Sequence, residues 1–150
     1  MAEEQILQFD VVDMMKMIPH RYPFILVDRV TECVPGKYCK GYKNLTMNEE
    51  FFQGHFPGNP VFPGVLQLEA MAQMSASVLM PLEQYKDKLF LYAGIDGVRF
   101  RKQVKPGDRF DMESELVKIK GPIAKAHARG FVDGQLAVEA DLMFSIVGNK

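Results

Sequence analysis

The chain has 150 residues, of which 47% are hydrophobic and 25% are charged, and its formal net charge at pH 7 is −1. These values are typical of a globular protein and predict one domain covering residues 1–150. The near-zero charge argues against a protein that binds nucleic acid through a basic surface.

The N-terminal sequence MAEEQILQFD is acidic and lacks the basic and apolar segments of a signal peptide. The longest weakly charged run, residues 51–82, is broken by proline, glycine and glutamine, so we expect no membrane span. Cys33 and Cys39 match no zinc-site spacing, and we expect free thiols in a reducing compartment, the cytoplasm.

Helix and strand signals follow one another along most of the chain. Residues 10–18 predict a short helix that is capped by Asp10 and ended by Pro19. Residues 22–34 and 38–46 predict two strands joined by a Pro-Gly turn, and residues 49–52 a short helical turn. Five alternating segments predict further strands, with a break near Asp96-Gly97 and a hairpin turn at Asp133-Gly134: residues 89–95, 98–104, 109–119, 123–132 and 136–147.

The strongest helix signal covers residues 64–80, GVLQLEAMAQMSASVLM, which carry one charged side chain, Glu69. A helix that is apolar or small on every side is expected to be buried on nearly every side. The sequence therefore predicts an α+β fold in which about six antiparallel strands wrap one long central helix.

The segment before this helix, GHFPGNPVFPG, places His55 among three prolines at positions 57, 60 and 63. Proline fixes φ and restricts the residue before it, so such a loop holds a side chain in one place. A histidine held in this way suits general acid or base catalysis. The alternative for an isolated loop histidine is a structural hydrogen bond to the backbone.

Glu69 and the start of the helix supply the other candidate groups. No lysine or arginine lies within four residues of Glu69, and a carboxylate on an apolar helix is costly unless it has a partner. Gly64 and Val65 open the helix, where free backbone N–H groups can bind an anion or a polarised carbonyl. Together these groups suit proton abstraction next to a carbonyl, with acid assistance to a leaving hydroxyl.

Other chemistries are less well supported by the sequence. The three histidines, His20, His55 and His127, show no paired metal-ligand spacing, and neither a phosphate-binding glycine loop nor a nucleophile elbow is present. A basic segment, VRFRKQVKPGDR, indicates an acidic partner, although a solvated strand face would have the same composition. Its candidate docking residues are Arg99, Arg101, Lys102 and Lys105.

Three segments of the sequence resemble motifs of one protein family. The segment GHFPGNPVFPGVLQLEAMAQ resembles the active-site signature of the 3-hydroxyacyl-[acyl-carrier-protein] dehydratases of type II fatty acid synthesis, of the broad-chain-length kind. IPHRYPFILVDRV and IDGVRFRKQVKPGD match the same family in the same order, so the resemblance covers about residues 10–148.

The resemblance implies a hot-dog fold and reversible dehydration of (3R)-3-hydroxyacyl thioesters to trans-2-enoyl thioesters, with no cofactor. It implies that His55 and Glu69 are catalytic and come from opposite subunits of a dimer, and that three dimers form a hexamer. It further implies that the N–H at Gly64 polarises the thioester carbonyl, and that the basic segment docks acyl carrier protein. The acyl chain, carried on phosphopantetheine, would enter an apolar tunnel near Phe56 and Tyr92.

Three alternatives remain open on the sequence alone. The related dehydratase/isomerase branch typically has aspartate at the position of Glu69 and a nearby tryptophan, and this chain contains no tryptophan. A hot-dog thioesterase would also carry a carboxylate on this helix, but the GHFPGNP loop argues against it. A non-catalytic acyl-binding module would not need both His55 and Glu69, and His20 we expect to be structural.

Overall fold

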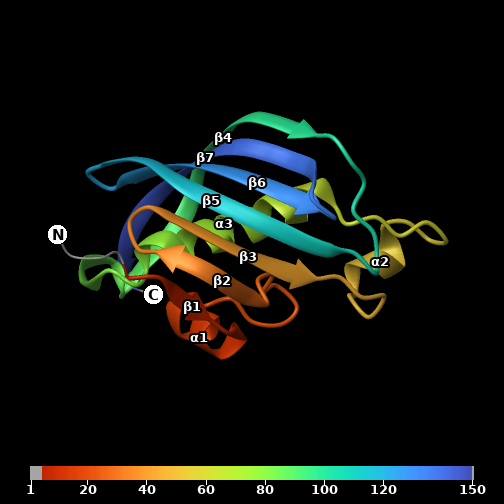
Figure 1. Ribbon diagram of the computed structural model, residues 1–150, viewed down its shortest axis with the longest axis horizontal. Coiled ribbons are helices and arrows are strands. Elements are labelled where there is room, and N and C mark those ends of the chain that lie inside the picture. Colours follow the sequence, from red (N-terminus) through yellow and green to blue (C-terminus); the bar gives the residue numbers. More distant parts are fainter. Residues whose placement is uncertain (1–4, 150) are drawn as a thin grey trace.

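The computed structural model describes residues 5–149 and consists of one antiparallel sheet curved around a long helix (Figure 1). The sheet has seven strands in the order β1-β2-β3-β5-β6-β7-β4. The strands are β1 (Leu7–Phe9), β2 (Arg29–Val34), β3 (Tyr38–Asn44), β4 (Lys88–Phe100), β5 (Arg109–Lys120), β6 (Ile123–Val132) and β7 (Gln135–Asn149). The helices are α1 (Val11–Met17), α2 (Phe51–Gly54) and α3 (Gly64–Leu79), with a 3₁₀ turn at Glu83–Tyr85. The α+β architecture expected from the sequence is confirmed.

Two differences from the expected elements have clear physical reasons. Strand β1 was not expected, because three residues are too few to show a period-two pattern. Residues 22–28 were expected to begin a strand, but β2 starts only at Arg29. The backbone N–H of Leu26 and the carbonyl of Phe24 instead bond to the side chain of Gln73. These groups are therefore satisfied without a neighbouring strand.

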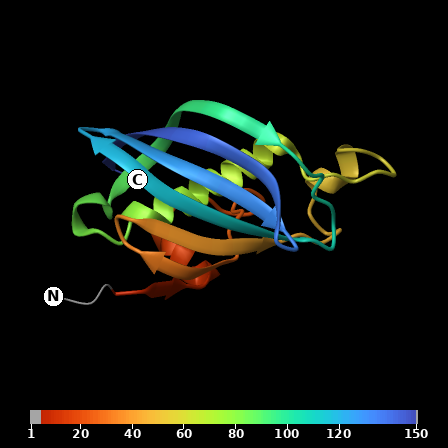
Figure 2. The same cartoon turned by 45° about the horizontal axis from the view of Figure 1, so that its top comes forward.

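Helix α3 lies inside the curve of the sheet, as Figures 1 and 2 both show. Most of its residues are buried, and they pack mainly on β3, β5 and β6. Burial is not complete, because Val65 is 74% exposed and Glu69 and Ala72 are partly exposed. These three residues lie at i, i+4 and i+7, so they form one stripe along the helix. The sheet of a single chain therefore leaves this stripe of α3 uncovered.

The outer face of the sheet carries charges whose sign alternates from strand to strand. The paired register brings Lys40 opposite Glu113, Glu113 opposite Arg129, and Arg129 opposite Glu139. Arg99 on β4 lies opposite Glu139 as well, and Glu32 on β2 lies opposite Lys40. Opposite charges on directly paired residues stabilise neighbouring strands. The inner face of the same strands holds the apolar core.

Strand β4 forms one edge of the sheet, and no strand formed by residues 5–149 lies beyond it. Its thirteen residues form one continuous strand with a register shift between Asp96 and Arg99, where the sequence predicts a break. Leu91, Ile95 and Phe100 on this strand are exposed. A long edge strand with exposed apolar side chains is a surface to which another chain can add.

Candidate active site

The candidate residues are distributed over two cavities. One, here called the His55 pocket, is lined by His55, Gly64 and Val65, together with the end of β4 and the residues that follow it. The other, here called the Glu69 cavity, is lined by Glu69, Gln73, His20 and Tyr92, among others. Within one chain, His55 and Glu69 therefore line different cavities, whereas His55 and Gly64 share one.

His55 follows directly on α2 and is held by the loop that the sequence marks as stiff. Its ring Nδ1 lies 2.9 Å from the carbonyl oxygen of Val61, and its own carbonyl accepts the N–H of Val61 at 2.9 Å. A carbonyl can only accept, so neutral His55 carries its proton on Nδ1. The other ring nitrogen, Nε2, then holds a free lone pair and can act as a base. Phe56 stacks on the His55 ring and lines neither cavity.

The first turn of α3 provides hydrogen-bond donors beside His55. Pro63 precedes the helix and makes no side-chain cap, and its carbonyl accepts the N–H groups of Leu66 and Gln67. The N–H groups of Gly64 and Val65 have no acceptor within the helix. At Gly64 a Cβ would lie 2.8 Å from the ring of Phe100, so a larger residue here would have to displace that exposed ring.

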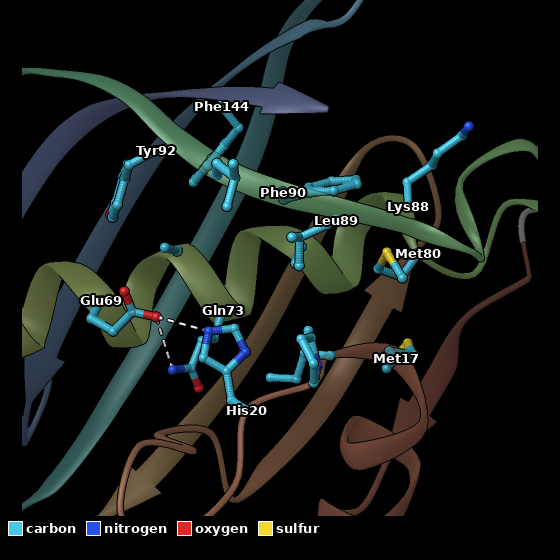
Figure 3. Close-up of a pocket in the computed structure, with 15 residues that line it drawn as sticks. Met17, His20, Glu69, Gln73, Met80, Lys88, Leu89, Phe90, Tyr92 and Phe144 are labelled. Atoms are coloured by element: carbon cyan, nitrogen blue, oxygen red, sulfur yellow. Dashed lines mark hydrogen bonds and ion pairs between the residues drawn. The ribbon is translucent and has the colours of Figure 1, made fainter. Parts of the chain in front are cut away.

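Glu69 is held by a hydrogen-bond network that centres on Gln73 (Figure 3). The Gln73 amide donates to Glu69 Oε2 at 3.0 Å and to the carbonyl of Phe24 at 2.7 Å. The Gln73 oxygen accepts the N–H of Leu26 at 2.7 Å, which fixes which end of the amide is nitrogen. One buried side chain thus fixes the Glu69 carboxylate and the loop before β2.

His20 also contacts Glu69, with its Nε2 3.3 Å from Glu69 Oε2 (Figure 3). From the sequence, His20 is expected to be structural, and Gln73 is not among the candidate site residues. The spacing of Glu69 and Gln73, i and i+4 on one helix, is the signal that indicates their contact. Both contacts are made to Oε2, and the Glu69 side chain remains 21% exposed. Glu69 therefore has polar partners and open space beside it, rather than full burial.

Tyr92 lines the Glu69 cavity and forms a hydrogen bond to the backbone of α3. Its hydroxyl donates to the carbonyl of Leu68 at 2.5 Å, and its ring stacks on Phe144. Burial, and to a lesser degree the negative charge of Glu69, raises the pKa of Tyr92 above its ordinary value. Tyr92 therefore stays a neutral phenol at physiological pH.

Two of the four basic residues expected from the sequence line the His55 pocket. Arg101 and Lys102 line the His55 pocket, and Arg99 and Lys105 are exposed nearby in the chain. Arg101 Nη2 lies 2.8 Å from Glu139, and this ion pair holds the pKa of Glu139 below its ordinary range. Strand β4 ends at Phe100, so the alternation expected up to residue 104 stops there.

Among residues 5–149, no group of three or more histidine, cysteine, aspartate or glutamate side chains is placed to hold a metal ion. No helix in the same part of the chain is both long and apolar enough to cross a bilayer.

Comparison with known proteins gives close relatives over nearly the whole chain. A family model described as a FabA-like domain matches residues 18–141. The 3-hydroxyacyl-[acyl-carrier-protein] dehydratase FabZ of Caldicellulosiruptor saccharolyticus is 53% identical over 138 residues, covering 92% of this chain and 99% of that protein. The protein of the same name in Clostridium novyi is 51% identical over 136 residues, covering 91% and 96%.

Solved structures show the same fold at much lower identity. The dehydratase heterocomplex ApeI:P from Xenorhabdus doucetiae contains a chain with a TM-score of 0.76 at 16% identity, covering 90% of this chain and 91% of that one. A thioesterase superfamily member from Thermus thermophilus has a TM-score of 0.63 at 16% identity, covering 76% and 83%. At such identities the likeness shows the fold alone, and it confirms the hot-dog architecture.

The Gln73 network predicts a large stability effect from one buried polar side chain. Gln73→Leu removes the partners of the Leu26 N–H and the Phe24 carbonyl, and we expect the free energy of unfolding to fall by about 3 kcal/mol. Urea denaturation followed by circular dichroism measures this change. Gln84→Leu, at an exposed position, is the matched control. Equal stability of the two variants would show that the network contributes nothing.

Proposed function

The chain belongs to the family of FabA-like domains, and we propose that it acts as a two-subunit dehydratase with His55 and Glu69 as the catalytic pair. Its reaction is the reversible dehydration of (3R)-3-hydroxyacyl-[acyl-carrier-protein] to trans-2-enoyl-[acyl-carrier-protein], in the elongation cycle of fatty acid synthesis. The single observation that carries this conclusion is the 53% identity to a FabZ dehydratase along 92% of the chain. The enzyme is a hydro-lyase.

The proposed mechanism follows from the donors and acceptors at each half-site. The N–H groups of Gly64 and Val65 polarise the thioester carbonyl, which acidifies the neighbouring C2–H bond. His55 Nε2 removes that proton, while the Nδ1 hydrogen bond to Val61 keeps the ring oriented. Glu69, which enters the step as the carboxylic acid, donates its proton to the hydroxyl that leaves C3, so the C2–H and C3–O bonds break, a C2=C3 double bond forms and water departs. Proton exchange with solvent then removes the proton gained by His55 and restores the one lost by Glu69. The alternative, in which His55 carries both protons and Glu69 orients the hydroxyl, uses the same residues.

We propose that a second copy of the chain completes each site. In one chain His55 and Glu69 line separate cavities, so a site that needs both must take one from a neighbour. The α3 stripe of Val65, Glu69 and Ala72 is uncovered, and exposed apolar residues flank it on β4. Pairing of two β4 edges would cover this surface and extend the sheet across both copies. The family resemblance implies that three such dimers assemble into a hexamer.

The acidic partner is the acyl carrier protein that bears the substrate. Arg101 and Lys102 line the pocket that holds His55, so a carrier protein bound there would deliver its phosphopantetheine arm beside the base. Arg99 and Lys105 extend the basic surface. We propose that the acyl group runs past Tyr92, whereas Phe56 acts only through its stacking contact with the His55 ring.

The reaction needs only acid and base groups, and we propose that it uses no cofactor beyond the phosphopantetheine of the carrier protein. Cys33 and Cys39 are free, buried and directly opposite each other on β2 and β3. Opposed thiols that stay reduced fit a reducing compartment, and we propose the cytoplasm as the location.

The first test measures products and the two catalytic assignments. With 3-hydroxyacyl carrier protein, the wild type should produce enoyl absorbance and no free thiol, since elimination leaves the thioester intact. His55→Ala and Glu69→Gln should each lower turnover on the order of 10²-fold or more while the circular dichroism spectrum is retained. Free thiol in place of enoyl product would indicate a thioesterase. A folded Glu69→Gln enzyme with normal turnover would remove Glu69 from the mechanism.

A second test asks whether each site is shared between copies. Purified His55→Ala and Glu69→Gln proteins are mixed, dissociated in mild denaturant and allowed to re-associate. Random pairing makes half of the dimers mixed, and each mixed dimer holds one intact site, so about one quarter of wild-type turnover should return. Size-exclusion chromatography controls for re-association. Dimers that re-form without any recovered activity would contradict the shared site.

A third test concerns carrier-protein docking. Lys102→Glu should raise KM for the carrier-protein substrate by about tenfold at low salt, and the effect should shrink as salt increases. KM for a short pantetheine thioester should rise much less, because that substrate lacks the acidic protein. Lys118→Glu, an exposed charge reversal on β5, is the control. An equal rise in KM for both substrates would argue for a role at the thioester rather than in docking.

A further inference from the structure

The peptide group between Val61 and Phe62 connects His55 to the rest of the fold. Its carbonyl, on Val61, lies 2.9 Å from the His55 ring nitrogen Nδ1. Its N–H, on Phe62, donates to the carbonyl of Val104 at 2.7 Å. Hydrogen bonds in such a series polarise one another, so the bond to Val104 makes the Val61 oxygen a better acceptor. The orientation of the His55 ring therefore depends on how this one peptide group is held.

Gln67 holds the next two carbonyls along the chain. Its side-chain Nε2 donates to the carbonyl of Phe62 at 3.0 Å, and its backbone N–H donates to the carbonyl of Pro63 at 3.0 Å. The peptide group that contains the Pro63 carbonyl also contains the N–H of Gly64, which is one of the two proposed thioester donors. One residue thus holds the junction between the loop that carries His55 and the helix start that carries the donors.

The Gln67 side chain contributes little net stability at this position. The residue is 4% exposed and lines the His55 pocket. Its Oε1 is buried and has no hydrogen-bond partner among residues 5–149, which is unfavourable. An apolar side chain of similar length would remove this unpaired oxygen and leave the Phe62 carbonyl without its donor instead, so the number of unpaired oxygens would stay the same. What the amide adds is a fixed direction for the Phe62 carbonyl.

We propose that Gln67 is a positioning residue for the dehydration. It keeps the base, His55, and the donor N–H of Gly64 in a fixed relation, because it holds the two carbonyls that lie between them in the chain. This inference rests on the proposed function, which supplies the roles of His55 and Gly64, and Gln67 itself touches no reacting atom. Loss of its side-chain bond leaves the substrate bound but the base misaligned, and a misplacement of about 1 Å can lower a rate by about 10²-fold.

The first test replaces the amide with an apolar side chain of similar length. Gln67→Met should lower kcat for 3-hydroxyacyl carrier protein by about tenfold or more, while KM stays within about twofold, because alignment is lost and binding is not. The midpoint of urea denaturation should stay close to that of the wild type. Gln135→Met, at an exposed position at the start of β7, is the matched control and should leave kcat unchanged. A folded Gln67→Met enzyme with wild-type kcat, or with a raised KM alone, would overturn the inference.

Gln67→Glu provides a second test, which decides the matter if the methionine variant is destabilised. A protonated carboxyl group can donate to the Phe62 carbonyl as the amide does, whereas a carboxylate cannot. The ratio of variant to wild-type kcat should therefore be near one at low pH and fall as the pH rises and the new carboxyl group ionises. Titrations that both enzymes share cancel in this ratio. A ratio that stays constant from about pH 5 to 10 would overturn the inference. If the wild type itself forms no enoyl product, the proposed function fails instead, so the two failures are distinguishable.

Discussion

Removal of α3 from water is the constraint on which the rest of the structure depends. The helix carries one charged side chain in its sixteen residues, so it is stable only where something covers it. The sheet covers it by curving, and the outer face of that sheet can then be polar while its inner face is apolar. A single sheet of seven strands does not close completely around the helix. The stripe that stays open is the one that carries Glu69, so the exposed part of the helix includes the residue that we propose to be catalytic.

His55 and Glu69 are positioned by two different physical means. His55 depends on its own loop, in which prolines limit the backbone and the Val61 carbonyl orients the ring. Glu69 depends on a neighbouring side chain, Gln73, which donates one hydrogen bond to Glu69 and makes two more that join the helix to the segment before β2. The first arrangement is local in the chain, and the second bridges residues almost fifty positions apart. Loss of Gln73 therefore affects both the fold and the carboxylate.

Helices and strands with a local sequence pattern could be predicted, whereas contacts that depend on the three-dimensional fold could not. The helix at 64–80 and the strands from residue 109 onward follow from periodicity and turn residues, and the structure places them within one or two residues of the expected bounds. Strand β4 differs, because it runs without a break from Lys88 to Phe100 where two strands ending at residue 104 were expected. The Gln73 network could not be predicted, because its partners, Phe24 and Leu26, are distant in sequence and carry no polar side chain. Separation of His55 and Glu69 into two cavities depends on which faces of α3 the sheet covers, and no spacing along the chain contains that information.

The alternating charges on the outer face of the sheet have a consequence for folding. In the middle of β5 the outward side chains are Glu113 and Glu115, which lie opposite Arg129 and His127 of β6, whereas Lys118 lies opposite Lys125 towards one end of the pair. The middle of each strand therefore attracts its correct neighbour and repels a copy of itself. Two partly folded molecules that meet at high concentration would bring acidic strands against acidic strands, so intermolecular strand exchange is disfavoured at the stage when the sheet is still open.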